Sequence, residues 1–476
     1  MNLLLLLTSL AAIEFAAGAT FNVNSTADMP DIAPGNGVCR AANNKCTLRA
    51  AVQEANQDVV SDIILLPAGI YKLTLGQLQI AAGVTFRGSS QTTTVIDAAG
   101  KSRVLVANNG TVVEIWTLTM RNGFILNDDG GCVLNQGQLT LNKVVVSGCK
   151  LKGDGSSDLS GGGIANFGLL TLLDSQVTHN TVDNPVFANS TFGAGIANHP
   201  GARLVLTRTM VDGNVGLNAS NTLGGGIFND GNLDISESTV AQNRGEYGGI
   251  FNWGIARLVK TTVANNTGDL GSGGIANYAD GVLTLINCTI SGNSGVGSRS
   301  LRQGGGVSNI ATLRILNSTI FGNRGGAYAT GGINHDARAG NGTATIKNSI
   351  VAGNVSTSSP DCDSITSLTY SLIGNTKGCA VPAGTGNLRD LNPMLGPLAN
   401  NGGKTQTHAL LPGSVAINAG SPSPVGSGGN SCEKTDQRGV TRPQDGRCDM
   451  GAYERRPGLP HGSEVTGEEA GIAVEP

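Results

Sequence analysis

Gly224-Gly225-Gly226-Ile227-Phe228-Asn229 is one copy of a phrase, glycines followed by an apolar residue and an asparagine, that recurs through the middle of the sequence. The apolar member returns 23 residues later between Ile227 and Ile250, and 32 residues later between Ile164 and Ile196. Further copies occupy 130–135, 161–166, 193–198, 248–252, 273–277, 304–309 and, in shortened form, 331–334. Self-similarity at this period is typical of solenoids.

A second phrase lies between the copies and alternates apolar and polar residues with period two, as in 206–214 and 285–293. This alternation predicts short strands, and the Gly-Gly and Asn positions of the phrases predict turns. No repeat contains a helical pattern. We therefore expect an all-β, right-handed parallel β-helix, with one coil per repeat and coils stacked about 4.8 Å apart.

Stacked coils place equivalent residues in columns, and the columns are chemically uniform. One column reads Lys143, Asp174, Arg208, Glu237 and Lys260, with alternating charge, and continues as Asn287, Asn317 and Asn348. The next position is small in every coil, so Cys288 there is expected to be a buried free thiol rather than a nucleophile. A column of asparagines from Asn180 to Asn354 is expected to bond along the axis and to be structural.

The composition narrows the function. The chain has 476 residues, of which 71 are Gly, while aromatic residues make up only 4% and charged residues 14%. The net charge is -3 and no basic stripe occurs, so a nucleic-acid partner is not expected. No stretch is long and apolar enough to predict a transmembrane segment.

The ends of the sequence differ from its middle. Residues 1–19 are typical of a signal peptide, and nine cysteines fit an oxidising compartment, so secretion or a cell-surface location is expected. Residues 20–92 are predicted to form an N-terminal cap with a helix at about 46–57, 93–359 the repeats, 360–454 further coils and a C-terminal cap, and 455–476 a disordered tail. Four local disulfides are expected: Cys39 with Cys46, Cys132 with Cys149, Cys362 with Cys379, and Cys432 with Cys448.

Three stretches resemble known families. Residues 21–28, 37–39 and 46–56 resemble the CSLREA-type N-terminal segment of bacterial surface β-helix proteins, and the Gly-Gly-Gly-Ile-x-Asn phrases are similar to polymorphic outer-membrane protein repeats. Residues 392–414 and 436–454 resemble the choice-of-anchor Q domain. The resemblance implies an exported β-helix of the pectate-lyase-like superfamily and implies no reaction. Because the sequence stops shortly after Glu454, we expect release or non-covalent attachment.

A column of rings is the one specific hint of a ligand site. The residue after the phrase asparagine is Phe167, His199, Trp253 or Tyr278 in four of the repeats, and His335 in the shortened copy. Pointing outward, the four rings would offer faces on which sugars stack. Packing of the same rings against loops is the alternative, and the sequence leaves both open.

Catalytic candidates are less specific. Asp128, Asp129, Asp154 and Glu246 lie in loops, where a lyase could use acids to hold Ca²⁺, and a glycosidase would need two carboxylates about 5–9 Å apart. Solvated loop charges are the alternative. No metal site and no cofactor are expected, apart from Ca²⁺ if the chain is a lyase.

These observations predict a monomeric, secreted or surface-associated, adhesin-like binding scaffold whose partner is an extracellular polysaccharide or a cell-surface glycan. A polysaccharide-cleaving enzyme, more readily a lyase than a glycoside hydrolase, and a purely structural spike are the alternatives.

Overall fold

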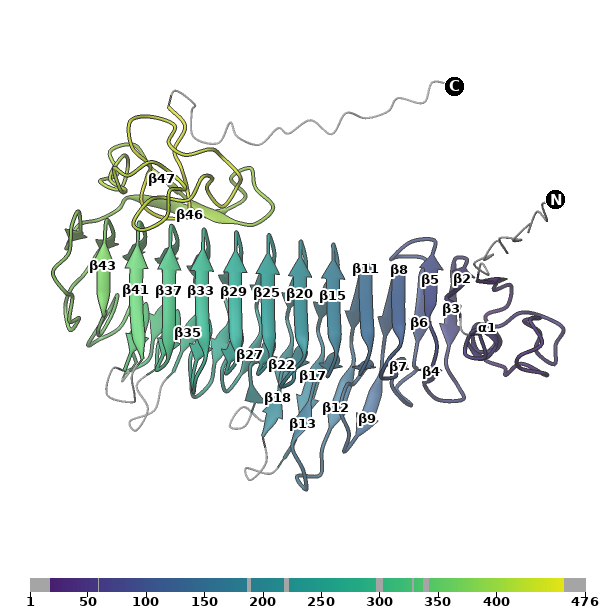
Figure 1. The fold of residues 1–476 in the computed structure, drawn as a ribbon. Helices are drawn as coiled ribbons and strands as arrows, with labels where there is room; N and C mark the ends of the chain where they lie inside the picture. The colour runs from purple at the N-terminus through teal and green to yellow at the C-terminus, as the bar shows by residue number, and fades with distance from the viewer. Residues whose placement is uncertain are drawn as a thin grey trace, which may run out of the picture.

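The computed structural model describes residues 18–58, 60–185, 190–217, 222–296, 303–327, 329–336 and 342–457. Figure 1 shows one long stack of parallel strands running from the N-terminal helix to the last coils. The prediction of an all-β parallel solenoid is confirmed. The predicted signal peptide and tail lie almost entirely outside the described residues.

The large sheet has 24 strands in the described part of the chain and forms two rows. The first row carries strands of three to ten residues: β1 (Thr20–Asn22), β2 (Asp62–Leu66), β5 (Val84–Gly88), β8 (Val112–Arg121), β11 (Gln138–Ser147), β15 (Leu169–Leu173), β20 (Arg203–Thr207), β25 (Asn232–Ser236), β29 (Ile255–Val259), β33 (Val282–Ile286), β37 (Thr312–Leu316), β41 (Thr343–Lys347) and β43 (Ser367–Thr369).

The second row follows after a one-residue bend, and β8 and β11 run through both rows. Its other strands are β3 (Gly69–Lys72), β6 (Thr94–Asp97), β16 (Gln176–Thr178), β21 (Met210–Asp212), β26 (Thr239–Ala241), β30 (Thr262–Ala264), β34 (Thr289–Ser291), β38 (Thr319–Phe321), β42 (Ile350–Ala352), β44 (Leu372–Ile373) and β45 (Leu388–Arg389).

Two narrower sheets complete each coil. The ten-stranded sheet holds the Gly-Gly-x-apolar-x-Asn phrases: β4 (Leu78–Ile80), β7 (Leu105–Ala107), β10 (Val133–Asn135), β14 (Ile164–Asn166), β19 (Ile196–Asn198), β24 (Ile227–Asn229), β28 (Ile250–Asn252), β32 (Ile275–Asn277), β36 (Val307–Asn309) and β40 (Ile333–His335). The eight-stranded sheet contains β9 (Phe124–Leu126), β12 (Lys150–Lys152), β17 (Thr181–Asp183), β22 (Val215–Gly216), β27 (Arg244–Gly245), β31 (Thr267–Gly268), β35 (Ser294–Gly295) and β39 (Arg324–Gly325).

The remaining elements are short. A three-stranded sheet of β13 (Leu159–Ser160), β18 (Thr191–Phe192) and β23 (Thr222–Leu223) lies in the loops, and β46 (Leu395–Ala399) pairs antiparallel with β47 (Thr407–Leu410). Helix α1 (Leu48–Ala55) lies beside the first coils, and Thr47 caps it by accepting the backbone N–H of Ala50. The helix expected at about 46–57 is therefore present and two residues shorter at each end.

The charged column lies at the bend between the two rows. Lys143, Asp174, Arg208, Glu237, Lys260, Asn287, Asn317 and Asn348, here called the bend column, all have φ between 44° and 52°. The register stacks them directly, since Leu173 pairs with Thr207 on one side of the bend and Gln176 with Met210 on the other. Left-handed backbone is costly for residues other than Gly and Asn, so the bend is specified by the strands around it.

The small inward column after the bend has a chemical role that the sequence did not indicate. The bend interrupts the backbone ladder, and a hydroxyl accepts the N–H that is left over, as Ser175 does from Val144 and Ser238 from Thr209, each at 3.0 Å. Cys288 occupies this column, is fully buried, and its thiol has a pKa raised by burial to about 12. It is the buried free thiol expected from the sequence.

The asparagine column from Asn180 to Asn354 forms a continuous ladder. Asn243 Oδ1 accepts from both the backbone N and the Nδ2 of Asn214, and Asn243 Nδ2 donates to Asn266 at 3.0 Å. The left-handed residue is the one before each asparagine, such as Gly213 or Gln242, rather than the asparagine itself. The ladder ends on Asp361, whose Oδ1 accepts from Asn354; a carboxylate suits a terminus that only accepts.

The asparagines of the Gly-Gly phrases form a second buried ladder, from Asn135 through Asn309. They lie inside strands and point inward, which corrects their prediction as turn residues. The position assigned to His335 in the shortened copy is also wrong. Asn309 pairs with His335 in the sheet, and Asn309 Nδ2 lies 3.0 Å from His335 Nδ1. His335 thus ends this ladder and does not belong to the column of rings.

Stacked strands are present on both sides of the 93–359 range. β2 and β5 are already stacked strands within 20–92, and β43 to β45 continue the stack after 359. The C-terminal segment, residues 390–457, then lies along the side of the solenoid over the second row, as both views show. It therefore covers a face of the large sheet. No helix in the described ranges is long and apolar enough to cross a membrane.

All four cysteine pairs expected from the sequence are disulfides in the structure. Cys39–Cys46 staples the loop before α1, Cys132–Cys149 and Cys362–Cys379 lie within the solenoid, and Cys432–Cys448 lies within the C-terminal segment. Disulfides persist in oxidising compartments. The four disulfides therefore indicate an oxidising environment for the chain.

Candidate functional site

The four rings proposed to face a ligand are engaged mainly with protein. Phe167 stacks on His199 with ring centroids 3.9 Å apart and an interplanar angle of 10°. Because these rings stack along the solenoid axis, this contact occupies one face of each ring, whereas a sugar platform needs a free face. Phe167 still exposes 42% of its surface. His199 is half-buried, its pKa is lowered by burial, and its Nε2 lies 2.8 Å from Ser160 Oγ.

Trp253 and Tyr278 belong to a satellite core outside the ten-stranded sheet. Trp253 meets Phe228 and Phe251 edge-on, each at 5.3 Å, and Tyr278 contacts Phe251 at 5.5 Å and Tyr247 at 5.7 Å. Burial raises the pKa of Tyr278, whose hydroxyl donates to Gln303. The packing of rings against loops, one of the two alternatives left open by the sequence, thus accounts for both residues, and ligand binding by the column stays a prediction.

Three of the four acidic candidates, Asp128, Asp129 and Asp154, lie in the loops that follow the neighbouring strands β9 and β12. Asp128 forms an ion pair with Arg103 at 2.6 Å, and Asp129 accepts the backbone N–H of Ser160. Asp154 is bonded to Asn127, and hydrogen bonds from Ser156 lower the pKa of its carboxyl. A lowered pKa suits a solvated structural acid better than a general acid.

Glu246 is far from the other three acids. It follows β27, whereas Asp128 and Asp129 follow β9, and four coil steps separate these strands in their sheet. At about 4.8 Å per coil the separation is roughly 19 Å, too large for a glycosidase pair. Burial raises the pKa of Glu246 to about 7. Among the described residues, no three His, Cys, Asp or Glu side chains are grouped closely enough to hold a metal ion.

A groove on the second row is the site that the tertiary structure adds. It consists of two adjoining hollows of about 280 and 420 Å³ that share Met210, Thr239 and Lys404. The floor is made by outward side chains of β21, β26 and β30, chiefly Met210, Thr239, Ala241 and Ala264. Its far wall is the strap, residues 400–406 of the C-terminal segment.

The rim of the groove is polar and amide-rich. Gln176, Gln242, Asn265, Asn400 and Gln406 line it. The hydroxyls of Thr209 and Thr405 are buried and donate to backbone carbonyls, which leaves the hydroxyl of Thr239 on the floor. Its charged residues are Asp174, Arg208, Asp212, Glu237 and Lys404. An apolar floor with a few placed polar groups is the usual composition of a ligand site.

The charged residues at the groove differ in whether they already have a hydrogen-bond or ion-pair partner. Arg208 forms two hydrogen bonds to Asp174, at 2.7 and 2.8 Å, and these lower the pKa of the Asp174 carboxyl. Burial raises the pKa of Asp212, against the opposing influence of His179. Three acids face two cations, so the groove as a whole does not favour a polyanion.

The strap is fixed to the sheet by hydrogen bonds. Thr405 Oγ1 donates to Lys260 O at 3.0 Å, Thr262 Oγ1 donates to Gln406 O at 2.6 Å, and Gln437 Nε2 bonds to both threonines. Gly403 lies so close to Arg438 that an added Cβ would stand 3.0 Å from its Cα. The wall of the groove is therefore held in place rather than free in solution.

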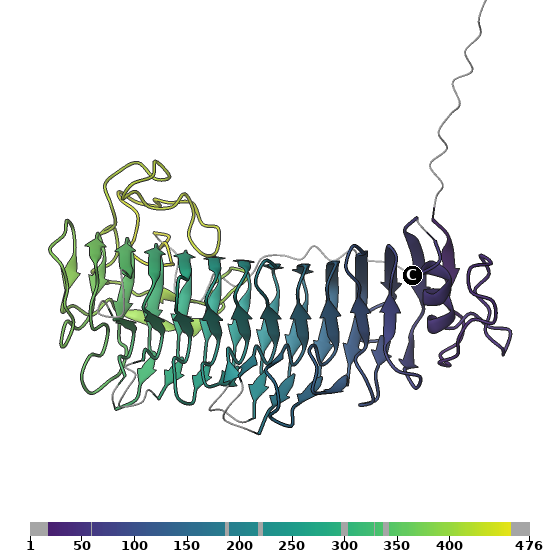
Figure 2. The ribbon, with the colours of Figure 1, turned by 60° about the horizontal axis from the view of Figure 1, so that its bottom comes forward.

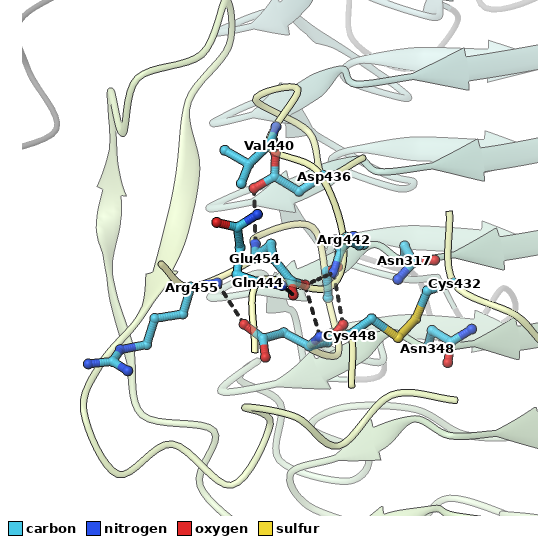
Figure 3. Close-up of polar contacts among 12 residues, drawn as sticks. Asn317, Asn348, Cys432, Asp436, Val440, Arg442, Gln444, Cys448, Glu454 and Arg455 are labelled. Atoms are coloured by element: carbon cyan, nitrogen blue, oxygen red, sulfur yellow. Dashed lines mark hydrogen bonds and ion pairs between the residues drawn. A yellow bond between two sulfur atoms is a disulfide. The ribbon is translucent and has the colours of Figure 1, made fainter. Parts of the chain in front are cut away.

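The C-terminal segment has its own buried polar core, seen in Figure 3. Arg442, with 1% of its surface exposed, pairs with Glu454 at 2.8 Å and donates to Asp449 O and Gly451 O. Asp436 accepts the backbone N–H groups of Arg438, Val440 and Glu454. The closed network explains how a segment with only two short strands keeps a defined shape.

The sequence does not indicate that Lys404 lies near Met210, because 194 positions separate the two residues (404 − 210) and no periodicity links the C-terminal segment to the coils. The asparagines of the bend column were the available signal. Asn287, Asn317 and Asn348 bond to Thr435, Glu433 and Ser421 of the segment. The change from charge to Asn in that column marks where the sheet becomes covered.

Comparisons with known proteins show no family for this chain. No family model matches the chain, and no curated protein matches it. Among solved structures, the crystal structure of pectate lyase Pel9A is similar at 14% identity and a TM-score of 0.43, over 93% of this chain and 97% of that chain. The resemblance to CSLREA-type, polymorphic outer-membrane and choice-of-anchor Q families remains a prediction.

Proposed function

We propose that this chain is a secreted or surface-associated binding scaffold that holds a glycan chain in the groove between the second row and the strap. One observation carries the proposal: two adjoining hollows with a mainly apolar floor and an amide-rich rim lie along a rigid sheet face. Sugars present apolar ring faces and many hydroxyls, which this combination can contact and bond.

The rigidity of the floor supports binding. The strands under Met210 and Thr239 are fixed by the backbone ladder and by the buried asparagine ladder beneath them. A preformed site loses little conformational entropy when a long ligand settles on it. Met210, which exposes 43% of its surface, supplies an adaptable apolar contact.

Binding without cleavage fits the charges better than a lyase does. A lyase acting on a uronate polymer must neutralise the sugar carboxylate, and Ca²⁺ held by clustered acids commonly does this. No such cluster is present in the described ranges, and Arg208 is already engaged with Asp174. Cleavage is nevertheless an outcome that the experiment below detects.

The test is binding to a panel of immobilised oligosaccharides with a groove-filling variant and a matched control. Thr239→Trp fills the floor of the groove, whereas Thr171→Trp places the same ring on an outward position of the first row. We expect at least a tenfold loss of affinity for Thr239→Trp, parent affinity for Thr171→Trp, and similar melting temperatures for both.

Three results would overturn the proposal. Parent protein that binds no glycan would leave a structural spike. Unsaturated products from uronate polymers, seen by ultraviolet absorbance and lost in Thr239→Trp, would make the groove a lyase site. Binding abolished by Phe167→Ala and retained in Thr239→Trp would move the site to the column of rings.

A further inference from the structure

Of the two cations at the groove, Lys404 is the one without a partner among the described residues. It is exposed, it lines both hollows, and no hydrogen bond or ion pair of its side chain occurs among the described residues. The other cation, Arg208, is held by Asp174 through two hydrogen bonds. The free ammonium therefore faces the space that a ligand would occupy, while the guanidinium beside it is already neutralised.

The backbone beneath Lys404 is unusually well fixed for an exposed loop. Thr405 and Gln406 on one side are bonded to Lys260 and Thr262 of the sheet. On the other side Gly402 has φ of 92°, and Gly403 packs against Arg438 with no room for a side chain. The fold therefore sets where the backbone of Lys404 lies along the groove, and only its side chain is left to move.

The surroundings limit how many negative charges the groove accepts. Asp174, Asp212 and Glu237 line the same two hollows. The pKa of Asp174 is lowered chiefly by its hydrogen bond to Arg208, and the charge of Lys404 acts in the same direction. A ligand with a carboxylate on every sugar would bring several of them near these acids. A ligand with one acidic group at Lys404 and neutral sugars elsewhere would avoid that repulsion.

From these contacts we infer that Lys404 is a specificity-determining residue, and that the ligand is a largely neutral glycan carrying an isolated acidic substituent, carboxylate or sulfate, that pairs with Lys404. The inference rests on the proposed function and names the substrate class of the same groove. A charge-assisted hydrogen bond of this kind is stronger than the neutral contacts around it.

The experiment uses matched oligosaccharides that differ in one acidic group. Xylohexaose is compared with xylohexaose bearing one glucuronate branch, and a lactosamine hexamer with its singly 6-sulfated form, by calorimetry on the full chain. In the parent we expect the acidic member of at least one pair to bind five- to tenfold more tightly, and the preference to shrink at high salt. The two pairs distinguish carboxylate from sulfate.

Variants separate the cation from general electrostatics. Lys404→Met is expected to abolish the preference and keep the affinity for the neutral member, and Lys404→Arg to retain the preference. Lys143→Met removes the same charge from the bend column outside the groove and is expected to change nothing. Equal binding of both members of both pairs by the parent, or a preference that survives Lys404→Met, would overturn the inference and leave the groove as a neutral glycan site. Absence of binding to all four oligosaccharides by the parent would instead count against the proposed function.

Discussion

The outer face of the second row falls into two halves, one closed and one open. From β30 to β42 it lies under the C-terminal segment, with Thr262, Thr289 and Thr319 bonded to it. From β16 to β26 it is open and carries Gln176, Met210 and Thr239. The backbone register and the buried ladders continue unchanged through both halves.

The difference teaches that the solenoid interior and its surface are specified separately. The inward columns of Leu, Ile, hydroxyl and Asn residues repeat in every coil because each coil must bury the same strip of the next. The outward positions are free to change. Where the segment docks they include threonines, the bend-column asparagines and the apolar Phe321 and Ile350. Where the groove is open they include Gln176, Met210 and Asp212. The groove lies at the border between the two.

The largest expected effect tests whether the interior is the same in both halves. Asn243→Leu in the open half and Asn323→Leu in the closed half should each lower the free energy of unfolding by about 2–4 kcal/mol, because each leaves buried ladder partners unpaired. Urea unfolding measures the loss. Asn232→Leu, an exposed position, is the control. A loss confined to one half would show that the two interiors differ.

A second prediction introduces an open-half residue into the closed half. Asn317 accepts the backbone N–H of Glu433 at 2.9 Å and is fully buried under the segment. Asn317→Lys should weaken docking by about 1–3 kcal/mol, because a buried ammonium replaces a bonded amide. Hydrogen exchange across 400–452 should accelerate. Lys143→Asn, the converse change in the uncovered part of the bend column, should leave that exchange at the parent rate.

A third prediction concerns pH and the end of the ladder in the closed half. Burial raises the pKa of Asp361 from 3.8 to about 6. The unfolded carboxyl thus ionises at lower pH than the folded one, so the stability from this group is full below pH about 4 and declines as the pH rises through 6. The melting temperature of the parent, relative to Asp361→Asn, should fall between pH 4 and 7.

Asp280→Asn, at an exposed position, supplies the baseline for the pH experiment. The difference in melting temperature between parent and Asp280→Asn should be constant across the same range. If Asp361→Asn tracked the parent at every pH, the carboxylate at the end of the ladder would not be the titrating group.

The smallest expected effect lies on the open half. Arg208 and Asp174 form the one bend-column ion pair within hydrogen-bond distance in the described residues, and both side chains are more than a third exposed. Exposed pairs contribute at most about 1 kcal/mol. Arg208→Ala should therefore lower the melting temperature by no more than a few degrees, and less in high salt. A larger, salt-independent loss would mean that the residue stabilises the bend itself.

Several features could be read from the residues because they repeat. The solenoid, the stacking of Lys143 on Asp174, the four disulfides, the buried Cys288 and the helix near Leu48 all follow from patterns within one or two coils. His335 was assigned one place too far along because the shortened phrase lost a residue, and a repeat read without its pairing partner has no register.

The sequence by itself determined the coil, since alternation and glycine positions dictate which residues face inward and where the chain turns. Only the tertiary structure decided what the outer faces do. The return of residues 390–457 onto β30–β42 brings Lys404 to Met210 across 194 positions, and it depends on complementary shapes and hydrogen bonds that leave no period in the sequence. Local patterns encode the strands because each coil sees the same neighbours, whereas a contact made once has no repetition to reveal it.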